Sequence, residues 1–135
     1  MDYDRTDFAA EVARLTDGRG VAVLYDGVGA RIWRGSMQAL AMRGSYLCLG
    51  QAWGPITDFA FSDLAPKSAR ATRPSLFHVI ADPAELRRRT AALFAAVTQG
   101  MLQSEPRQSM PLDQAAQAHA DLACRRTTGP TVSIP

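Results

Sequence analysis

A short apolar run followed by an acidic turn constrains this chain more than any other feature. Val21–Tyr25 contains no charged residue, and Asp26-Gly27-Val28-Gly29 follows it directly. An uncharged run of this length between turn residues is typical of a buried strand in a parallel sheet. The turn leads into a helical pattern, so we expect a loop at the carboxyl end of the strand, where open α/β sheets bind their ligands.

The same order of segments recurs once along the chain. Gly44–Leu49 is a second short apolar run, and Gly50–Pro55 is a second loop bounded by glycines. Ala30–Met42, between the two runs, has the spacing of a helix with an apolar stripe of Trp33, Met37, Leu40 and Ala41. Strand, helix and strand in this order predict a right-handed βαβ unit with parallel strands.

Three further helices are expected. Thr6–Leu15 begins at a cap on Thr6 or Asp7 and ends before Gly18. Pro83–Gln99 begins after Asp82, with Glu85 at capping-box spacing, and one face of it consists of Leu86, Thr90, Leu93, Phe94 and Val97. Leu112–Cys124 is expected to bury Ala115, Ala116, His119 and Leu122.

The other segments give weaker patterns. Ile56–Arg70 is predicted to be irregular with a short turn of helix, and Ala71–Leu76 to be an edge strand because it contains Pro74. Met101–Met110 is predicted to be a loop with some extended structure. Thr131–Ile134 alternates at period two and is predicted to be a terminal strand.

Composition narrows the class of protein. The 135 residues suffice for one domain with a core, and a net charge of +2 with no dense basic run argues against a nucleic-acid surface. Cys48 and Cys124 have no metal-ligand spacing, so we expect reduced packing cysteines and no bound zinc. No apolar run has the length of a membrane span, and the beginning of the chain is unlike a signal peptide, so we expect a soluble cytoplasmic protein with no membrane partner.

Acid–base candidates are few. Asp26 lies where a strand ends, but a carboxylate there more often caps its loop than transfers a proton. His119 is expected to be a hydrogen-bonded core histidine, and His78 has no suggestive partner. The G-x-G-x-x-G fingerprint of dinucleotide-binding folds does not occur in the sequence. From the residues alone, the chain is predicted to be part of an α/β sheet protein.

Several stretches together resemble a known family. They are Tyr25-Asp26-Gly27-Val28-Gly29, Thr72-Arg73-Pro74-Ser75-Leu76, Ala115-Ala116-Gln117-Ala118-His119 and Thr127-Thr128-Gly129. Their order is similar to the carboxyl-terminal portion of the quinone oxidoreductases, the zinc-free, zeta-crystallin-like branch of the medium-chain dehydrogenases/reductases. The resemblance implies the second half of a Rossmann-type doubly wound parallel sheet, followed by a carboxyl-terminal helix and strand. It also implies that a catalytic domain and a glycine-rich phosphate loop lie upstream of Met1.

The resemblance also implies a cofactor, a reaction and binding residues. The cofactor would be NADPH, and the reaction hydride transfer to a quinone or a similar electron-poor alkene. Residues 1–100 would form the partial NADP-binding domain, and residues 101–135 would return to the catalytic domain. The binding residues carried over are Tyr3 and Arg125 for the adenosine and phosphate groups, Val28 in the first loop, Leu49, Gly50 and Gln51 along the nicotinamide ribose, and Thr72 on the nicotinamide side. No catalytic residue and no metal ligand are carried over.

Some residues depart from the family's pattern. The family usually has Ser in place of Gly27 and Asn-Ser-Ser in place of Gln51-Ala52-Trp53, so the bulky Trp53 is expected to alter the substrate pocket. Three functional interpretations stay open. They are a part of an NADPH:quinone oxidoreductase that is inactive alone, a non-catalytic nucleotide-binding or dimerisation module, and an enoyl reductase of the same superfamily. A homodimer that pairs through the sheet edge near Ala71–Leu76 is expected whether the chain belongs to an enzyme or is a non-catalytic module.

Overall fold

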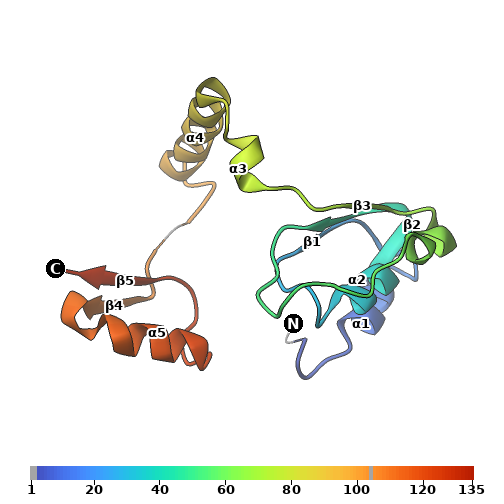
Figure 1. The fold of residues 1–135 in the computed structure, drawn as a ribbon, viewed down its shortest axis with the longest axis horizontal. Helices are drawn as coiled ribbons and strands as arrows, with labels where there is room; N and C mark the ends of the chain where they lie inside the picture. The colour runs from blue at the N-terminus through green and yellow to red at the C-terminus, as the bar shows by residue number, and fades with distance from the viewer. Residues whose placement is uncertain (1–2, 104) are drawn as a thin grey trace. The chain divides into compact units, whose positions relative to one another are not determined.

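The structure, a computed structural model, describes residues 3–103 and 105–135 (Figure 1). The chain divides between Asp82 and Pro83 into two compact units. The first contains a parallel sheet and its helices, and the second contains a long helix and a small two-stranded sheet. The division of function predicted between residues 1–100 and 101–135 stays a prediction.

The first unit contains a three-stranded parallel sheet in the order β1-β2-β3. Its strands are β1 (Val21–Asp26), β2 (Leu40–Cys48) and β3 (Arg70–Thr72). Tyr25 pairs with Leu47, and Leu47 pairs in turn with Thr72. The predicted α/β class and the parallel arrangement of the first two strands are confirmed, and the three strands end at the same edge of the sheet.

The first helix, α1 (Phe8–Leu15), begins where its capping residue predicts. The Asp7 carboxylate accepts hydrogen bonds from the backbone N–H groups of Ala9 and Ala10, both at 3.1 Å. These groups have no partner within the helix, so the cap satisfies them. The helix ends with the N–H of Gly18 donating to the carbonyl of Ala13 at 2.8 Å.

The second helix, α2 (Trp33–Ala39), is shorter than the predicted 30–42 segment, because β2 begins at Leu40 rather than near Gly44. Leu40, expected on the helix stripe, is 1% exposed within the sheet. Strands β1 and β2 fall out of register between the pairs Val21–Leu40 and Val23–Ser45. A strand that begins with such an irregularity lacks the alternation by which strands are recognised in a sequence, and the apolar residues around it matched a helical period instead.

The core of the first unit lies between α2 and the sheet. Its buried side chains are Trp33, Met37, Leu40, Tyr46, Cys48 and Ala69. The ring of Phe59, from the loop after β2, meets the Trp33 ring edge-on with centroids 5.5 Å apart. Cys48 is the packing residue predicted, whereas Cys124 is exposed and that part of the prediction is wrong.

The segment after β2 contains η1 (Phe61–Lys67), the short strand β3 and α3 (Leu76–Val79). The short turn of helix predicted within 56–70 is present as the seven-residue 3₁₀ helix η1. The strand predicted at 71–76 ends at Thr72, and Leu76 already lies in α3. Pro74 accounts for the early end, because proline has no N–H to donate and restricts the residue before it.

The second unit contains α4 (Pro83–Thr98), β4 (Gln108–Pro111), η2 (Leu112–Gln114), α5 (Ala115–Ala123) and β5 (Thr131–Ile134). The terminal strand has the predicted bounds and pairs in parallel with β4. The helix predicted at 112–124 begins with a 3₁₀ turn, η2, before α5. No helix within residues 3–103 and 105–135 combines the length and the apolar character needed to cross a membrane.

The apolar faces of α4 and α5 are exposed. Leu93 and Phe94 on α4, and Leu122 on α5, are 52%, 64% and 60% exposed, and His119 is also exposed. The burial predicted for the face of α5, including a core role for His119, is therefore wrong for the second unit of this chain. Helical periodicity shows which face is apolar, but it does not show whether the same chain supplies the surface that covers it.

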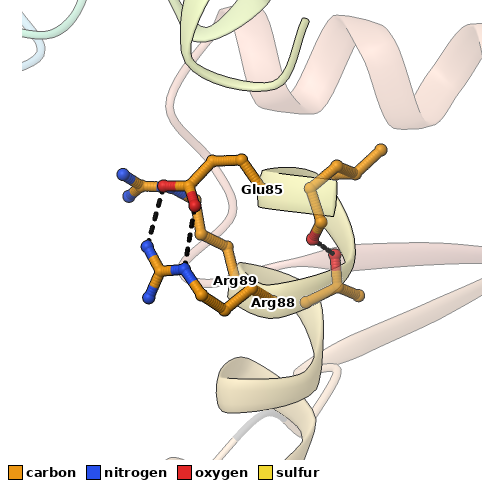
Figure 2. A network of polar contacts seen from close by, with 5 residues as sticks. Glu85, Arg88 and Arg89 are labelled. Carbon is orange, nitrogen blue, oxygen red and sulfur yellow. Dashed lines mark hydrogen bonds and ion pairs between the residues drawn. The ribbon is translucent and has the colours of Figure 1, made fainter. Parts of the chain in front are cut away.

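A charged network lies on the first turns of α4 (Figure 2). The Glu85 carboxylate accepts two hydrogen bonds from Arg88, both at 2.8 Å, and one from Arg89 at 2.7 Å. These hydrogen bonds lower the pKa of Glu85 to about 2. The capping-box spacing of Glu85 did not predict this pairing with the next turn.

Candidate cofactor site

Two loops run side by side at the carboxyl edge of the sheet in the first unit. They follow β1 and β2, and backbone hydrogen bonds join them. The carbonyl of Asp26 accepts from the N–H groups of Leu49 at 2.7 Å and Gly50 at 3.1 Å. The carbonyl of Val28 accepts from Trp53 at 2.9 Å. The two loops are therefore one structural unit, positioned by the ends of two neighbouring parallel strands.

The Asp26 side chain holds the first loop in shape. It is 1% exposed, and its Oδ1 accepts from the N–H groups of Val28 at 2.7 Å and Gly29 at 3.0 Å. Its Oδ2 accepts from the Tyr46 hydroxyl at 2.5 Å. The predicted loop-capping role is confirmed, and these three hydrogen bonds satisfy a carboxylate that burial would otherwise destabilise.

The Tyr46 hydroxyl is kept protonated by its surroundings. Burial and the neighbouring Asp26 carboxylate both raise the pKa of Tyr46 far above its ordinary range. A hydroxyl with so high a pKa is a poor proton donor in catalysis at neutral pH. We therefore assign Tyr46 and Asp26 to the framework of the site rather than to proton transfer.

Two glycines allow the loops to approach each other. A Cβ atom on Gly50 would lie 2.8 Å from the carbonyl oxygen of Gly27, and one on Gly29 would lie 2.7 Å from that of Gly54. Gly29 also has a φ of 84°, which glycine adopts readily. The close approach at Gly50 is thus between two segments of the protein's own backbone.

A pocket of about 250 Å³ opens at this edge of the sheet. Its polar lining comes from Gln51, Thr72 and Arg73. Its other lining residues are Tyr46, Cys48, Ile56, Phe59 and Ala71. Arg73 donates through Nη2 to Oε1 of Gln51 at 2.8 Å, which joins the end of β3 to the loop after β2.

Trp53 lies on the same pair of loops and is 47% exposed. The guanidinium of Arg31 lies over its ring, 4.6 Å from the centroid, and also pairs with Asp4 at 2.6 Å. Trp53, which stands where the family usually has a small serine, therefore stacks on Arg31 at the surface of the first unit. It is not among the residues that line the pocket.

The structure brings together most of the predicted binding residues. Val28, Leu49, Gly50 and Gln51 lie on the paired loops, and Thr72 shares the pocket with Gln51. Tyr3 is half-buried in the turn before α1. Arg125 belongs to the second unit, where it follows α5 with a left-handed φ of 55°.

Sequence reasoning missed two side chains at this edge. Arg73 was recognised only as part of a motif, and its place one residue beyond an edge strand could have indicated a position at the carboxyl edge. Tyr46 was recognised only as part of an apolar run. In the part of the chain that the structure describes, no three His, Cys, Asp or Glu side chains group so as to hold a metal ion.

Comparison with known proteins identifies the family. The family model described as "Zinc-binding dehydrogenase" matches residues 1–132. The chain belongs to the zinc-binding dehydrogenase family. The predicted resemblance to quinone oxidoreductases, and to the cofactor-binding half of their fold, is confirmed by the relatives described next.

Three relatives of this zinc-binding dehydrogenase chain illustrate the match. It is 38% identical to a quinone oxidoreductase of Pseudomonas aeruginosa and 35% identical to a 2-haloacrylate reductase of a Burkholderia species, with all of the chain covered in both. The crystal structure of Escherichia coli quinone oxidoreductase, complexed with NADPH, is 32% identical over the whole chain with a TM-score of 0.90.

The chain corresponds to only a part of these proteins. It spans 42%, 41% and 42% of the P. aeruginosa, Burkholderia and E. coli relatives, respectively, and matches their carboxyl-terminal part.

Proposed function

We propose that the chain is the carboxyl-terminal part of an NADPH-dependent reductase that acts on a quinone or a similar electron-poor alkene. The observation that carries this proposal is the pair of joined loops beside a pocket at the carboxyl edge of a parallel sheet, the place where such sheets bind nucleotides. Membership of the dehydrogenase family and the NADPH-bound E. coli relative support it.

The residues at the edge of the sheet suit one end of a dinucleotide. A pocket of about 250 Å³ has room for a single ring rather than for a whole dinucleotide. We assign the nicotinamide end to Leu49, which is 53% exposed, with Gly50, Gln51 and Thr72. Val28, on the neighbouring loop, would contact the cofactor from the β1 side.

Within the first unit, the adenosine end of the cofactor is assigned to Tyr3, which supplies a half-buried aromatic ring. Arg125, in the second unit, is proposed by the family resemblance alone as a cation that suits a phosphate. NADPH, when bound, supplies the hydride. The protein's residues hold the cofactor in position and keep water from it, and Asp26 and Tyr46 at this edge are assigned to the framework of the site rather than to proton transfer.

We expect the 135 residues alone to bind NADPH weakly and to turn over no quinone. The sequence has no G-x-G-x-x-G, the turn by which dinucleotide folds present helix N–H groups to the pyrophosphate. The loss of several charge-assisted hydrogen bonds, each contributing about 1.5–3 kcal/mol, weakens an affinity by orders of magnitude.

The test is a titration of the 135-residue chain with NADPH, followed by calorimetry and by backbone NMR shifts. We expect millimolar affinity, with shifts at Val28, Leu49, Gly50 and Thr72. Thr72→Val should weaken binding, whereas Thr98→Val, on the exposed surface of α4, should not. NMR shifts confined to other residues would refute the placement of this site. Micromolar affinity together with quinone turnover would show that the 135 residues need no further groups to bind NADPH.

Two other functions compete with this proposal. A non-catalytic nucleotide-binding or dimerisation module, even as part of a longer protein, would bind NADPH but would not oxidise it. An enoyl reductase would oxidise NADPH with an enoyl thioester and not with a quinone. Steady-state assays of the longer protein with both acceptors separate the three functions.

We also propose a homodimer and a cytoplasmic location. The strand β3 forms one edge of the sheet, and Leu76 and Phe77, which follow it, are 67% and 80% exposed. Unpaired edges with exposed apolar side chains favour pairing with a second copy. Leu76→Asp should lower the dimer fraction in sedimentation experiments. The cytoplasm is supported by two cysteines that are both free thiols.

A further inference from the structure

Arg31 connects three segments of the first unit that are far apart in sequence. It lies between the first loop and α2. Its guanidinium lies over the ring of Trp53, on the second loop, 4.6 Å from the ring centroid. Its Nη2 also lies 2.6 Å from Oδ1 of Asp4, the residue that follows Tyr3. A single side chain therefore joins the turn before α1 to both loops at the carboxyl edge of the sheet.

The backbone fixes Arg31 and Trp53 relative to each other. The N–H of Trp53 donates to the carbonyl of Val28 at 2.9 Å, and the N–H of Ala30 donates to that of Gly54 at 3.2 Å. A guanidinium is planar, so stacking on a ring leaves its N–H donors at the edge of the plane, where they fit a carboxylate. The stack on Trp53 thus aims the donors of Arg31 at Asp4.

The connection joins the two ends of the proposed cofactor site. Tyr3, beside Asp4, is assigned to the adenosine end, and Leu49 and Gln51, on the same loop as Trp53, are assigned to the nicotinamide end. A ligand that needs a certain arrangement of a site binds more weakly when that arrangement is populated for only part of the time. A side chain that keeps the Tyr3 turn beside the loops would therefore raise the affinity for the cofactor without touching it.

We propose that Arg31 is a positioning residue for the cofactor, which holds the turn of Tyr3 and Asp4 against the paired loops. The inference rests on the proposed function and adds to it a residue outside the set that contacts NADPH. The side chain of Arg31 is 43% exposed, so its replacement should leave the fold of the first unit intact.

The test uses two probes that report on the two ends separately. ADP represents the adenosine end, and nicotinamide mononucleotide represents the nicotinamide end; both carry phosphate. Each is titrated into the 135-residue chain and into Arg31→Gln, and binding is followed by the NMR signals of Tyr3 and Leu49. We expect Arg31→Gln to weaken ADP by about three- to tenfold, the range for the loss of one exposed ion pair and one exposed cation–π contact. Nicotinamide mononucleotide should bind as before. Equal affinities for ADP, or an equal loss for both probes, would overturn the proposal.

Arg34 provides a matched control. It also lies over a tryptophan ring, that of Trp33 at 4.5 Å, and it also pairs with an aspartate, Asp58. Neither partner lies on the paired loops or on the turn before α1. Arg34→Gln removes the same charge and should leave the affinities for both probes unchanged. If it weakens ADP as much as Arg31→Gln does, the effect is one of net charge and the proposal is wrong.

Asp4→Asn separates positioning from direct contact with a phosphate. If Arg31 bound a phosphate itself, loss of the Asp4 carboxylate would release its guanidinium and strengthen ADP binding. A positioning role predicts the opposite result. Asp4→Asn should weaken ADP, although it removes a negative charge, and the double variant with Arg31→Gln should lose no more than Arg31→Gln alone, because both changes break one contact. Stronger ADP binding in Asp4→Asn would overturn the proposal.

The two probes also separate this inference from the function on which it rests. If neither ADP nor nicotinamide mononucleotide binds the unaltered chain, the proposed cofactor site is wrong and the role of Arg31 is wrong with it. If both bind at the expected residues and Arg31→Gln changes neither affinity, the cofactor site stands and only the role of Arg31 is overturned.

Discussion

The hydroxyl of Tyr46 donates to Oδ2 of Asp26 at 2.5 Å, with both side chains nearly excluded from solvent at 2% and 1% exposure. The same carboxylate accepts from two N–H groups of the first loop, and the backbone carbonyl of Asp26 accepts from two N–H groups of the second. One residue thus joins β1, β2 and both loops of the proposed cofactor site. The shape of that site depends on a buried polar network as well as on apolar packing.

Removal of the Tyr46 hydroxyl should therefore destabilise the first unit. Tyr46→Phe keeps the ring but leaves Oδ2 of the buried Asp26 carboxylate without this donor, so we expect the free energy of unfolding to fall by about 2 kcal/mol. Urea denaturation measures it. The matched control is Tyr25→Phe, since Tyr25 is 69% exposed on β1 and its change should stay within about 0.5 kcal/mol. Equal losses in both variants would contradict the role given to the buried pair.

The same pair predicts a loss of stability at high pH. Burial and Asp26 raise the pKa of Tyr46 in the folded state, whereas tyrosine in the unfolded chain ionises near pH 10. The folded state therefore retains a proton that the unfolded state releases. This contribution is complete below about pH 10 and is lost above it, at up to about 1.4 kcal/mol per pH unit. Other groups titrate in this range, so the quantity to measure is the difference in the free energy of unfolding between wild type and Tyr46→Phe. It is followed from about pH 9 to about pH 11, roughly one unit on either side of the ordinary tyrosine pKa. If this difference in unfolding free energy does not change with pH, the raised pKa of Tyr46 does not contribute to stability as predicted.

The framework of the first unit could be predicted from local patterns, whereas the contacts between loops could not. The run Val21–Asp26 and the cap at Asp7 are signals contained in neighbouring residues, and both were found. The pairing of Asp26 with Tyr46 and of Gln51 with Arg73 joins residues far apart in sequence. Such contacts depend on the register of parallel strands, which no short pattern specifies.

Helix ends and burial account for the other errors. The predicted helix at 30–42 included Leu40 because a strand with an irregular start has no clear alternation. The apolar residues of α5 were recognised correctly, but they were expected to be buried. Leu122, for example, is 60% exposed. An amphipathic pattern shows which face of a helix is apolar, but it does not show which surface, if any, covers that face.

The network on α4 gives a prediction for the second unit. Arg88 and Arg89 lower the pKa of Glu85 to about 2, so its carboxyl should titrate well below an ordinary glutamate in a carbon-detected NMR experiment. Because the folded pKa is depressed, the contribution of the network to helix stability is present above about pH 4, the ordinary range of glutamate, and is lost as the pH falls towards 2. The network is exposed, so about 1 M salt should raise the midpoint by screening.

Single arginine variants provide the control for this network. Arg88→Gln removes two of the three hydrogen bonds to Glu85, and Arg89→Gln removes one. The midpoint should rise in both variants, and more in the first. A Glu85 midpoint that neither variant moves would show that these contacts do not form in solution.

Gly50 and Gly27 offer a matched pair that tests the joined loops themselves. A Cβ on Gly50 would lie 2.8 Å from the carbonyl oxygen of Gly27, whereas a Cβ on Gly27 has no heavy atom within 4 Å. Gly50→Ala should force the loops apart and cost about 1–3 kcal/mol, as overpacking does elsewhere in proteins. Gly27→Ala, which adds the same methyl group to the facing residue, should cost less than about 0.5 kcal/mol.

Urea denaturation gives the two costs in unfolding free energy. Amide exchange at Leu49, whose N–H donates to the carbonyl of Asp26, reports on the separation of the loops. Faster exchange in Gly50→Ala alone is the expected result, because only that substitution displaces the second loop from the first. If the two alanine variants behave alike, the glycine at position 50 is not needed for contact between the loops, and a ligand becomes the better reason for its presence.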